Sequence, residues 1–271
     1  MNWKLLVGGV VGALGVFSSN VVTAETGVSE STILVGQSAP LSGPSQELGN
    51  DMKLGIQLYF DHVNSQGGIN GRKLELKVLD DGYEPERCAE NTRKLIDEDV
   101  FALFGYIGTP TSVAALPLAQ QAKIPFFAPF TGAIALREPL NRGTFHLRAS
   151  YNDETATIVK HLTGLGLTRI GVFYQNDAYG KAGLDGMTLA LSALGLKPVA
   201  QATVERNSVD DGDDVRDLAG GLVDALHGLD HTAHHFSALN GHAGGARGEL
   251  VGLSGRISIL VNGAAHFRHG G

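Results

Sequence analysis

In residues 101–112, FALFGYIGTPTS, an apolar run stops at a glycine and gives way to small hydroxylated residues. The pattern predicts a buried parallel strand that ends at a loop able to bind an anion. Thr109 suits the N-cap of a following helix and Pro110 suits its first position, so backbone N–H groups should be left unpaired at this helix end. Together with the positive end of the helix dipole, these donors can hold a carboxylate or a phosphate without any catalytic residue.

A second loop of the same kind, APFTGA at residues 128–133, follows the next strand-like run. In an open α/β sheet, ligands bind beyond the carboxyl ends of neighbouring strands, where such loops converge. The two loops therefore predict one pocket. The alternative is that Thr109 only caps its own helix, a role worth about 1 kcal/mol and compatible with binding.

Around these loops the chain alternates short apolar runs with helical patterns from Thr32 to about Val204. This order is typical of parallel sheets covered on both faces by helices, so the sequence predicts an α/β fold. The expected strands are 33–38, 73–79, 100–106, 124–128, 145–148, 169–174 and 198–204, and the expected helices are 51–63, 85–98, 112–122, 152–165 and 182–194. Two lobes that join near residues 148–152 explain this order better than one sheet.

The composition is that of a globular protein with a sizeable core, since 43% of the 271 residues are hydrophobic. The net charge of −7 gives no basic face, which argues against nucleic acid as a partner. The sequence contains no Gly-x-Ser-x-Gly elbow, P-loop or zinc-protease motif, so we expect no enzyme activity and no cofactor. We interpret Asp80 and Asp81 as a solvated strand terminus rather than a metal or acid pair, and Asp177 as a turn residue.

The N-terminal 24 residues have the pattern of a signal peptide. Lys4 precedes an apolar run at residues 5–17, and residues 22–24, VTA, match a small-residue cleavage site. An uncleaved membrane anchor is the alternative, but the run is shorter than the ~20 residues that a span needs. We therefore expect residues 1–24 to be removed and the mature protein to lie in the periplasm. Export permits disulfides, yet Cys88 is the only cysteine, so it is either a free thiol or pairs with a cysteine outside this sequence.

Beyond about Ser208 the sequence changes character. No lysine follows Lys197, seven of the ten histidines lie in residues 227–269, and the alternation of strand and helix patterns stops. We expect residues 208–271 to be an atypical tail that is either disordered or translated out of frame. The sole metal-like group of side chains lies in this tail, and we interpret it as accidental rather than as a metal site. It consists of His231, His234, His235 and His242.

Six short motifs stand in a fixed order along the chain. They are APLSGP at 39–44, GGING at 67–71, DD at 80–81, GYIGTPTS at 105–112, PFFAPFTGA at 125–133 and YQNDAYG at 174–180. Each is weak alone, but in this order behind a signal peptide they resemble the leucine/isoleucine/valine-type solute-binding proteins of ABC transporters. The resemblance covers Ile33 to about Ser208 and implies the type I periplasmic binding fold, with two lobes that are each a parallel sheet flanked by helices. Residues 25–150 would form the N-terminal ligand-binding lobe and residues 151–207 the start of a second, incomplete lobe.

The resemblance also implies a ligand site between the lobes, which close on a bound amino acid. In that family a Ser/Thr hydroxyl and backbone amides hold the ligand carboxylate, and the matching residues here are Gly108 and Thr109. Contacts from the next strand end fall on Phe130, Thr131 and Gly132, where carbonyl and hydroxyl groups would help to hold the ammonium.

Several positions depart from the family pattern. An aromatic residue at the mouth of the site falls on Leu48, and a family threonine falls on Gly132. The aromatic residue of the far lobe falls on Tyr179, which could instead be an ordinary core aromatic. The acidic partner of the ligand ammonium belongs to sequence after Ser208, where the resemblance ends. The ligand can therefore differ from a branched-chain amino acid.

From these observations we expect an exported solute-binding protein that captures an amino acid or a related small carboxylate. Its partners would be that ligand and the permease subunits of an ABC importer in the inner membrane. The alternatives are a sensor domain that hands its ligand signal to a receptor, and a nonfunctional truncated gene product. A truncated product would expose apolar faces and an unpaired sheet edge, which favour aggregation.

Overall fold

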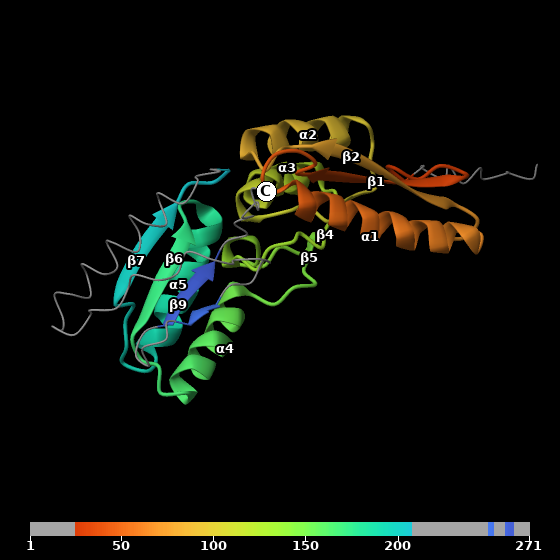
Figure 1. Cartoon of the computed structure of the whole chain (residues 1–271). Coiled ribbons are helices and arrows are strands. Elements are labelled where there is room, and N and C mark those ends of the chain that lie inside the picture. The colour runs from red at the N-terminus through yellow and green to blue at the C-terminus, as the bar shows by residue number, and fades with distance from the viewer. Residues whose placement is uncertain (1–24, 208–248, 252–257, 263–271) are drawn as a thin grey trace, which may run out of the picture.

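The computed structural model describes residues 25–207, 249–251 and 258–262, and these form two α/β lobes (Figure 1). The first lobe contains β1 (Thr32–Ala39), α1 (Gln46–Ser65), β2 (Lys73–Asp80), α2 (Pro85–Asp97), β3 (Ala102–Phe104), α3 (Thr109–Ala122), β4 (Phe126–Phe127), the 3-10 helix η1 (Ile134–Leu136) and β5 (Thr144–Phe145). The second lobe contains α4 (Tyr151–Gly164), β6 (Ile170–Gln175), α5 (Ala178–Ser192), β7 (Ala200–Val204), β8 (Glu249–Val251) and β9 (Ser258–Asn262). The predicted α/β class with two lobes is confirmed.

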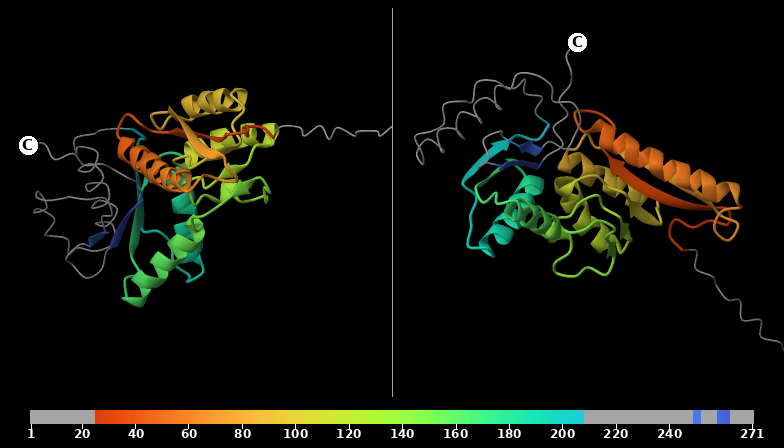
Figure 2. Two further views of the ribbon diagram at one scale, coloured as in Figure 1. Left: turned by 90° about the vertical axis from the view of Figure 1, so that its right-hand side faces the viewer. Right: turned by 60° about the horizontal axis from the view of Figure 1, so that its bottom comes forward.

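The first lobe is built on a five-stranded sheet in the order β2-β1-β3-β4-β5, in which every pair is parallel. Helices α2 and α3 lie on one side of this sheet and α1 on the other (Figures 1 and 2). The last five residues of β1 are all buried, which is typical of a strand covered on both faces. Helix α1 packs on its side of the sheet through Ile56 and Phe60, which lie one turn apart on its buried face.

The main core lies between the first sheet and helices α2 and α3. It contains Leu95, Leu103, Tyr106 and Phe126, and the rings of Tyr106 and Phe126 meet edge to face with centroids 5.0 Å apart. Cys88 belongs to the same core and is fully buried. A separate, smaller core packs between helices α4 and α5 and the second sheet.

The second sheet has the order β7-β6-β9-β8, with β6 parallel to both of its neighbours and β8 antiparallel to β9. Side-chain caps set the starts of its two helices. Ser150 and Asp153 form a reciprocal capping box at α4. Asp177 is the N-cap of α5 and accepts hydrogen bonds from the N–H groups of Tyr179 and Gly180 at 2.9 and 3.2 Å. Helix α5 therefore begins at Ala178, four residues before the predicted start.

Two strands, β8 and β9, fall in residues 208–271, where we expected a tail that is either disordered or translated out of frame. Strand β9 pairs with β6 along its whole length, from Ser258 opposite Ile170 to Asn262 opposite Tyr174. Residues 258–262 are therefore ordered rather than disordered, because the aliphatic residues of SILVN suit a strand between β6 and β8. Translation out of frame stays a prediction. The predicted signal peptide at 1–24 and the four tail histidines lie outside the described residues. Within the described part of the chain, no helix is long and apolar enough to cross a membrane.

An aromatic row crosses the α1 side of the first sheet. The ring centroids of Phe104 and Phe127 are 5.4 Å apart, and those of Phe127 and Phe145 are 5.7 Å apart. Phe104 packs against the core beneath α1, whereas Phe145 is 46% exposed and nearby Leu147 is 75% exposed. Among the described residues, α1 thus shields only one end of this row, and the other end forms an apolar surface patch.

Candidate ligand-binding site

The two loops that the sequence singles out meet at the carboxyl ends of β3 and β4. The N–H of Phe130 donates to the carbonyl of Tyr106 at 2.7 Å, and the N–H of Gly108 donates to the carbonyl of Phe130 at 3.3 Å. Ile107 and Phe130 also form a parallel bridge between the loops. The loops therefore converge at the sheet edge where α/β folds bind their ligands.

Two threonine hydroxyls, one from each loop, face each other at this junction. Oγ1 of Thr109 lies 2.6 Å from Oγ1 of Thr131, and the N–H of Ala133 donates to the Thr131 oxygen at 3.1 Å. Thr109 is 1% exposed and Thr131 is fully buried. Only one proton fits between two hydroxyl oxygens, so one of the two hydroxyls keeps a proton that it can donate to another acceptor.

The helix after the first loop starts at Thr109, three residues before the expected helix 112–122, and its N-cap lies one residue before the predicted cap. Gly108, not Thr109, is the N-cap of α3, and Thr109 lies in the first turn without a side-chain capping bond. Gly108 has φ 91° and ψ 162°, a backbone conformation that is essentially confined to glycine. The interpretation of Thr109 as a helix cap is therefore wrong, because its hydroxyl turns to Thr131 instead.

Tyr83, which our sequence reasoning missed, covers the junction from the turn after β2. A Cβ atom built on Gly108 would lie 2.2 Å from Cε2 of Tyr83, so the ring packs directly on the glycine. Tyr83 is 7% exposed and has φ 66°, which is rare for an aromatic residue. Burial, and then repulsion from Asp177, raise the pKa of its phenol, so the hydroxyl stays protonated at neutral pH. Its only signal in the sequence is its position just after the paired aspartates.

Two neighbouring aspartates hold the turn that carries Tyr83. Asp81 is fully buried, and its carboxylate accepts hydrogen bonds from the Ser38 hydroxyl at 2.7 Å and from the Tyr83 N–H at 2.8 Å. Burial raises the pKa of Asp81. Burial opposes ionisation of Asp80 as well, but hydrogen bonds from a hydroxyl and two backbone N–H groups outweigh it and lower the pKa to about 2. The expectation of a solvated strand terminus is wrong for Asp81, and in the described residues no group of three His, Cys, Asp or Glu side chains could hold a metal.

The second loop reaches the second lobe through two tyrosines. The N–H of Tyr151 donates to the carbonyl of Gly132 at 2.7 Å, and a Cβ on Gly132 would lie 2.6 Å from Cδ1 of Tyr151. The ring of Tyr151 meets that of Tyr179 edge to face, with centroids 5.6 Å apart. Tyr179 also packs against the core of the first lobe, and burial raises the pKa of its phenol. The predicted residues Gly132 and Tyr179 are thus connected through Tyr151, which the sequence motifs did not indicate.

Arg148 lies over the rings of both Phe130 and Tyr151. Its guanidinium carbon is 5.1 Å from the Phe130 centroid and 5.2 Å from the Tyr151 centroid. It also donates to both carboxylate oxygens of Glu154, at 2.8 and 2.9 Å, and these bonds raise its pKa. Arg148 is therefore a fixed cation that holds Phe130 beside the start of α4.

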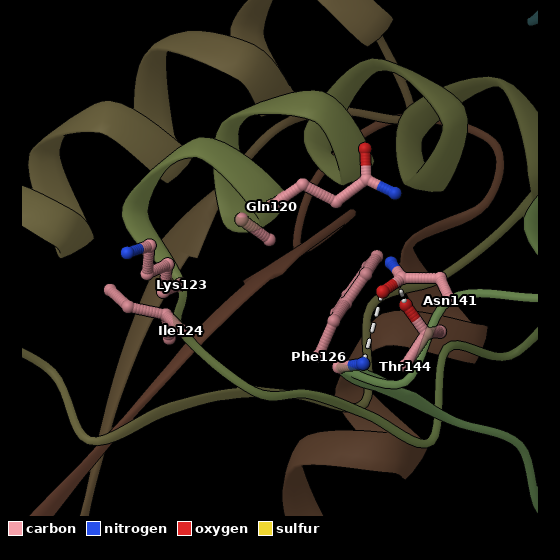
Figure 3. Close-up of a pocket in the computed structure, with 8 residues that line it drawn as sticks. Gln120, Lys123, Ile124, Phe126, Asn141 and Thr144 are labelled. Atoms are coloured by element: carbon pink, nitrogen blue, oxygen red, sulfur yellow. Dashed lines mark hydrogen bonds between the residues drawn. The ribbon is translucent and has the colours of Figure 1, made fainter.

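Two hollows lie near these strands. An open apolar groove of about 500 Å³ runs between α1 and the carboxyl ends of β3, β4 and β5, and Phe130, which is 38% exposed, forms part of its wall. A hollow of about 260 Å³ lies at the opposite ends of β4 and β5, between Lys123, Phe126 and Asn141 (Figure 3). Since ligands of parallel sheets bind at the carboxyl ends of strands, the second hollow is away from the candidate site.

Six of the seven predicted site residues are thus connected by contacts across the two loops and the two tyrosines. They are Gly108, Thr109, Phe130, Thr131, Gly132 and Tyr179. Leu48 lies half-buried in the first turn of α1, and its role at the mouth of the site stays a prediction.

A family model described as periplasmic binding protein matches residues 32–244, which extends beyond Ser208, where we expected the resemblance to end. The chain is 29% identical over 220 residues to Leu/Ile/Val-binding protein homolog 8 of Brucella abortus, covering 76% of this chain and 52% of that protein. A solved structure of a possible leucine/isoleucine/valine-binding protein from Rhodopirellula baltica is 38% identical, with a TM-score of 0.66 over 74% of this chain and 55% of that one. A fatty acid ABC transporter substrate-binding protein from Thermomonospora curvata is 25% identical, with a TM-score of 0.67 over 73% of this chain and 50% of the other. The chain spans about half the length of the curated relatives it matches.

Proposed function

The chain belongs to the periplasmic binding protein family, and on that premise we propose that it captures an amino acid in the periplasm and delivers it to the permease of an ABC importer. Its similarity to proteins of the Leu/Ile/Val-binding type supports a solute-binding role of that type. The family and the fold are those of substrate-binding proteins rather than of enzymes. The ligand, the permease and the periplasmic location are the parts that we propose.

The observation that carries the proposal is the Thr109–Thr131 pair at the start of α3. One hydroxyl of the pair retains a proton for a further acceptor. In the same turn the N–H groups of Gly108 and Ser112 are bonded to backbone carbonyls and Pro110 has none. Within the described part of the chain, the amides of Thr109 and Thr111 donate no hydrogen bond, so a ligand carboxylate here would meet a hydroxyl, two amides and the helix dipole.

Entry of a ligand requires the lobes to move apart. The two threonines are buried, and Tyr83, Tyr151 and Tyr179 surround the junction. A ligand that contacts the Thr109 turn on the first lobe and Tyr179 on the second would bind the closed arrangement more tightly than the open one. Closure would then enclose the ligand.

The ligand that we favour is a small carboxylate with an apolar side chain. The uncharged phenols of Tyr83 and Tyr179 and the ring of Phe130 form a largely neutral environment. The backbone at Gly132 lies close to Tyr151, which leaves little room for a large ligand there. The names of the Brucella and Rhodopirellula proteins point to branched-chain amino acids, while that of the Thermomonospora protein points to a longer aliphatic acid. L-leucine is therefore the first ligand to test.

Isothermal titration calorimetry with L-leucine, L-valine, L-glutamate and octanoate tests the proposal. We expect an aliphatic ligand to bind, and Thr109→Val to weaken it by about 1 to 3 kcal/mol because a charged hydrogen bond is lost. Thr109→Ser keeps the hydroxyl and should bind nearly as the wild type does. Thr157→Val, an exposed threonine on α4, is the matched control. Failure of all four ligands to bind the folded chain would refute the proposed class, and equal affinity in Thr109→Val would remove Thr109 as the carboxylate donor.

A further inference from the structure

Besides the contacts of Tyr151 and Tyr179, the lobes touch through the turn after β2 and the residues that follow β7. Nη2 of Arg206 donates to Oε2 of Glu84 at 2.8 Å. Nδ2 of Asn207 donates to Oε1 of Glu84 at 2.6 Å and to the carbonyl of Gly82 at 3.1 Å. These hydrogen bonds join residues that lie 122 to 125 positions apart in the chain and belong to different lobes.

Arg206 stands between a carboxylate of each lobe. Asp177, on its own lobe, lies 3.8 Å from Nη1, and Glu84, on the other lobe, lies 2.8 Å from Nη2. The side chains of Arg206 and Glu84 are 24% and 38% exposed, so water can replace the bond between them. If the lobes part, Arg206 keeps Asp177 as a partner. Opening therefore leaves no uncompensated buried charge.

Two buried polar atoms of this contact make no hydrogen bond to the described residues, which weakens the closed arrangement. Nε of Arg206 and Oδ1 of Asn207 are buried without a hydrogen-bond partner in the part of the chain that the structure describes. Closure thus forms three hydrogen bonds between the lobes but removes two polar atoms from water. The unsatisfied atoms therefore offset part of the stabilisation that the three hydrogen bonds give to the closed arrangement.

The contact is coupled to the candidate site through Tyr83. Tyr83 stands between Gly82 and Glu84 in the chain, and its ring packs on Gly108 beside Thr109. After burial, repulsion from Asp177 of the second lobe contributes to raising the pKa of its phenol. The turn that receives Arg206 and Asn207 is therefore the same turn that covers the start of α3.

We propose that Arg206 and Asn207 form a latch that closes the lobes on Glu84 and Gly82 without any ligand, and that this latch sets how often the Thr109–Thr131 site is open. The inference rests on the proposed function in one respect, because it takes ligand exchange as the event that the latch controls. A ligand that needs the closed state binds less tightly when the latch is lost, since part of its binding free energy must then close the lobes.

Distances between spin labels test the latch in the absence of ligand. Nitroxides at Lys53→Cys on α1 and Lys160→Cys on α4, both exposed positions, report the separation of the lobes by double electron–electron resonance. The buried Cys88 should stay unlabelled, which the chain without introduced cysteines checks. We expect a narrow, short distance in the wild type and an added longer distance in Arg206→Ala.

Three further variants make the result specific. Glu84→Gln should open the lobes as Arg206→Ala does, and it leaves α2 intact because Glu84 makes no side-chain capping bond. Arg206→Lys keeps the charge and should stay mostly closed. The double variant Arg206→Ala/Glu84→Gln should open less than the two single variants added together, because both substitutions remove the same Arg206–Glu84 bond. Arg142→Ala, an exposed arginine at the far end of the first sheet, is the matched control.

Identical distance distributions in the wild type, Arg206→Ala and Glu84→Gln would overturn the latch, and so would additive opening in the double variant. Titration with L-leucine then separates this inference from the proposed function. If the wild type binds L-leucine, Arg206→Ala should weaken binding about threefold to tenfold. If the wild type binds none of the proposed ligands while the label distances respond as expected, the proposed function fails and the latch stands.

Discussion

Substituting alanine for Gly108 is expected to lower the free energy of unfolding by about 2 to 6 kcal/mol. The first part of this loss is backbone strain, since φ 91° and ψ 162° lie in a region that costs an L-residue about 1 to 3 kcal/mol. The second part is steric. A new Cβ would lie 2.2 Å from Cε2 of Tyr83 in a buried site, and overpacking of this kind costs about 1 to 3 kcal/mol.

Two comparisons separate these parts. Gly67 also has a positive φ, 97°, but a Cβ there would meet nothing within 4 Å, so Gly67→Ala should show only a backbone cost of about 1 to 2 kcal/mol. In a Tyr83→Ala background the clash is gone, and Gly108→Ala should then cost about 1 to 3 kcal/mol less than it does in the wild type.

Urea unfolding followed by circular dichroism measures all four variants, with the midpoint compared at constant slope. The reasoning is refuted if Gly108→Ala is no more destabilising than Gly67→Ala. It is also refuted if the loss at Gly108 is the same with and without the Tyr83 ring, because Tyr83 would then not pack on this glycine.

Two further predictions concern charge and surface. The pKa of Asp80 is lowered from 3.8 to about 2, so its carboxylate contributes stability above pH 3.8 that is lost as the pH falls through about 2. Between pH 4 and pH 2 the wild type should therefore lose more unfolding free energy than Asp80→Asn does. Equal losses in urea titrations of the two proteins would contradict this prediction. Leu147→Lys should slow heat-induced light scattering while changing stability by no more than about 0.5 kcal/mol, because Leu147 is 75% exposed beside the aromatic row. Leu189→Lys, at a position 61% exposed on the second lobe, is the control, and the same slowing in both would show that the aromatic row has no special role.

Local patterns in the sequence predicted most of the strands, helices and loops of the first lobe. The strand and helix periods and the small-residue loops at 105–112 and 128–133 depend on neighbours within a few positions, and the structure brings those loops together. The N-cap at Gly108 was missed because a threonine next to a proline looks locally like a good cap. Only the nearness of Thr131, which no local pattern reveals, draws the Thr109 hydroxyl away.

Other residues were not predicted for the same reason, because their positions depend on contacts between segments far apart in the chain. Asp81 resembles a polar strand end, and its burial depends on Ser38 from the neighbouring strand β1. The place of Tyr83 on Gly108 and of Tyr151 between Gly132 and Tyr179 depends likewise on the assembled sheet. Strand β9 was overlooked because it is a short apolar run in a segment of biased composition, whose partner β6 lies far back in the chain.

The pairing of β6 with β9 also bears on the order in which the protein folds. All described strands of the first sheet have left the ribosome once Phe145 has, and they follow one another with single helices between most of them. In the second sheet β6 can pair early with β7, but its pairing with β9 must wait until Ser258–Asn262 is synthesised and a long loop is closed. Folding should therefore be sequential, with the first lobe forming early and the second maturing slowly. During that interval β6 would present a bare edge to solvent, so the speed of synthesis should govern how much of the protein reaches its native state.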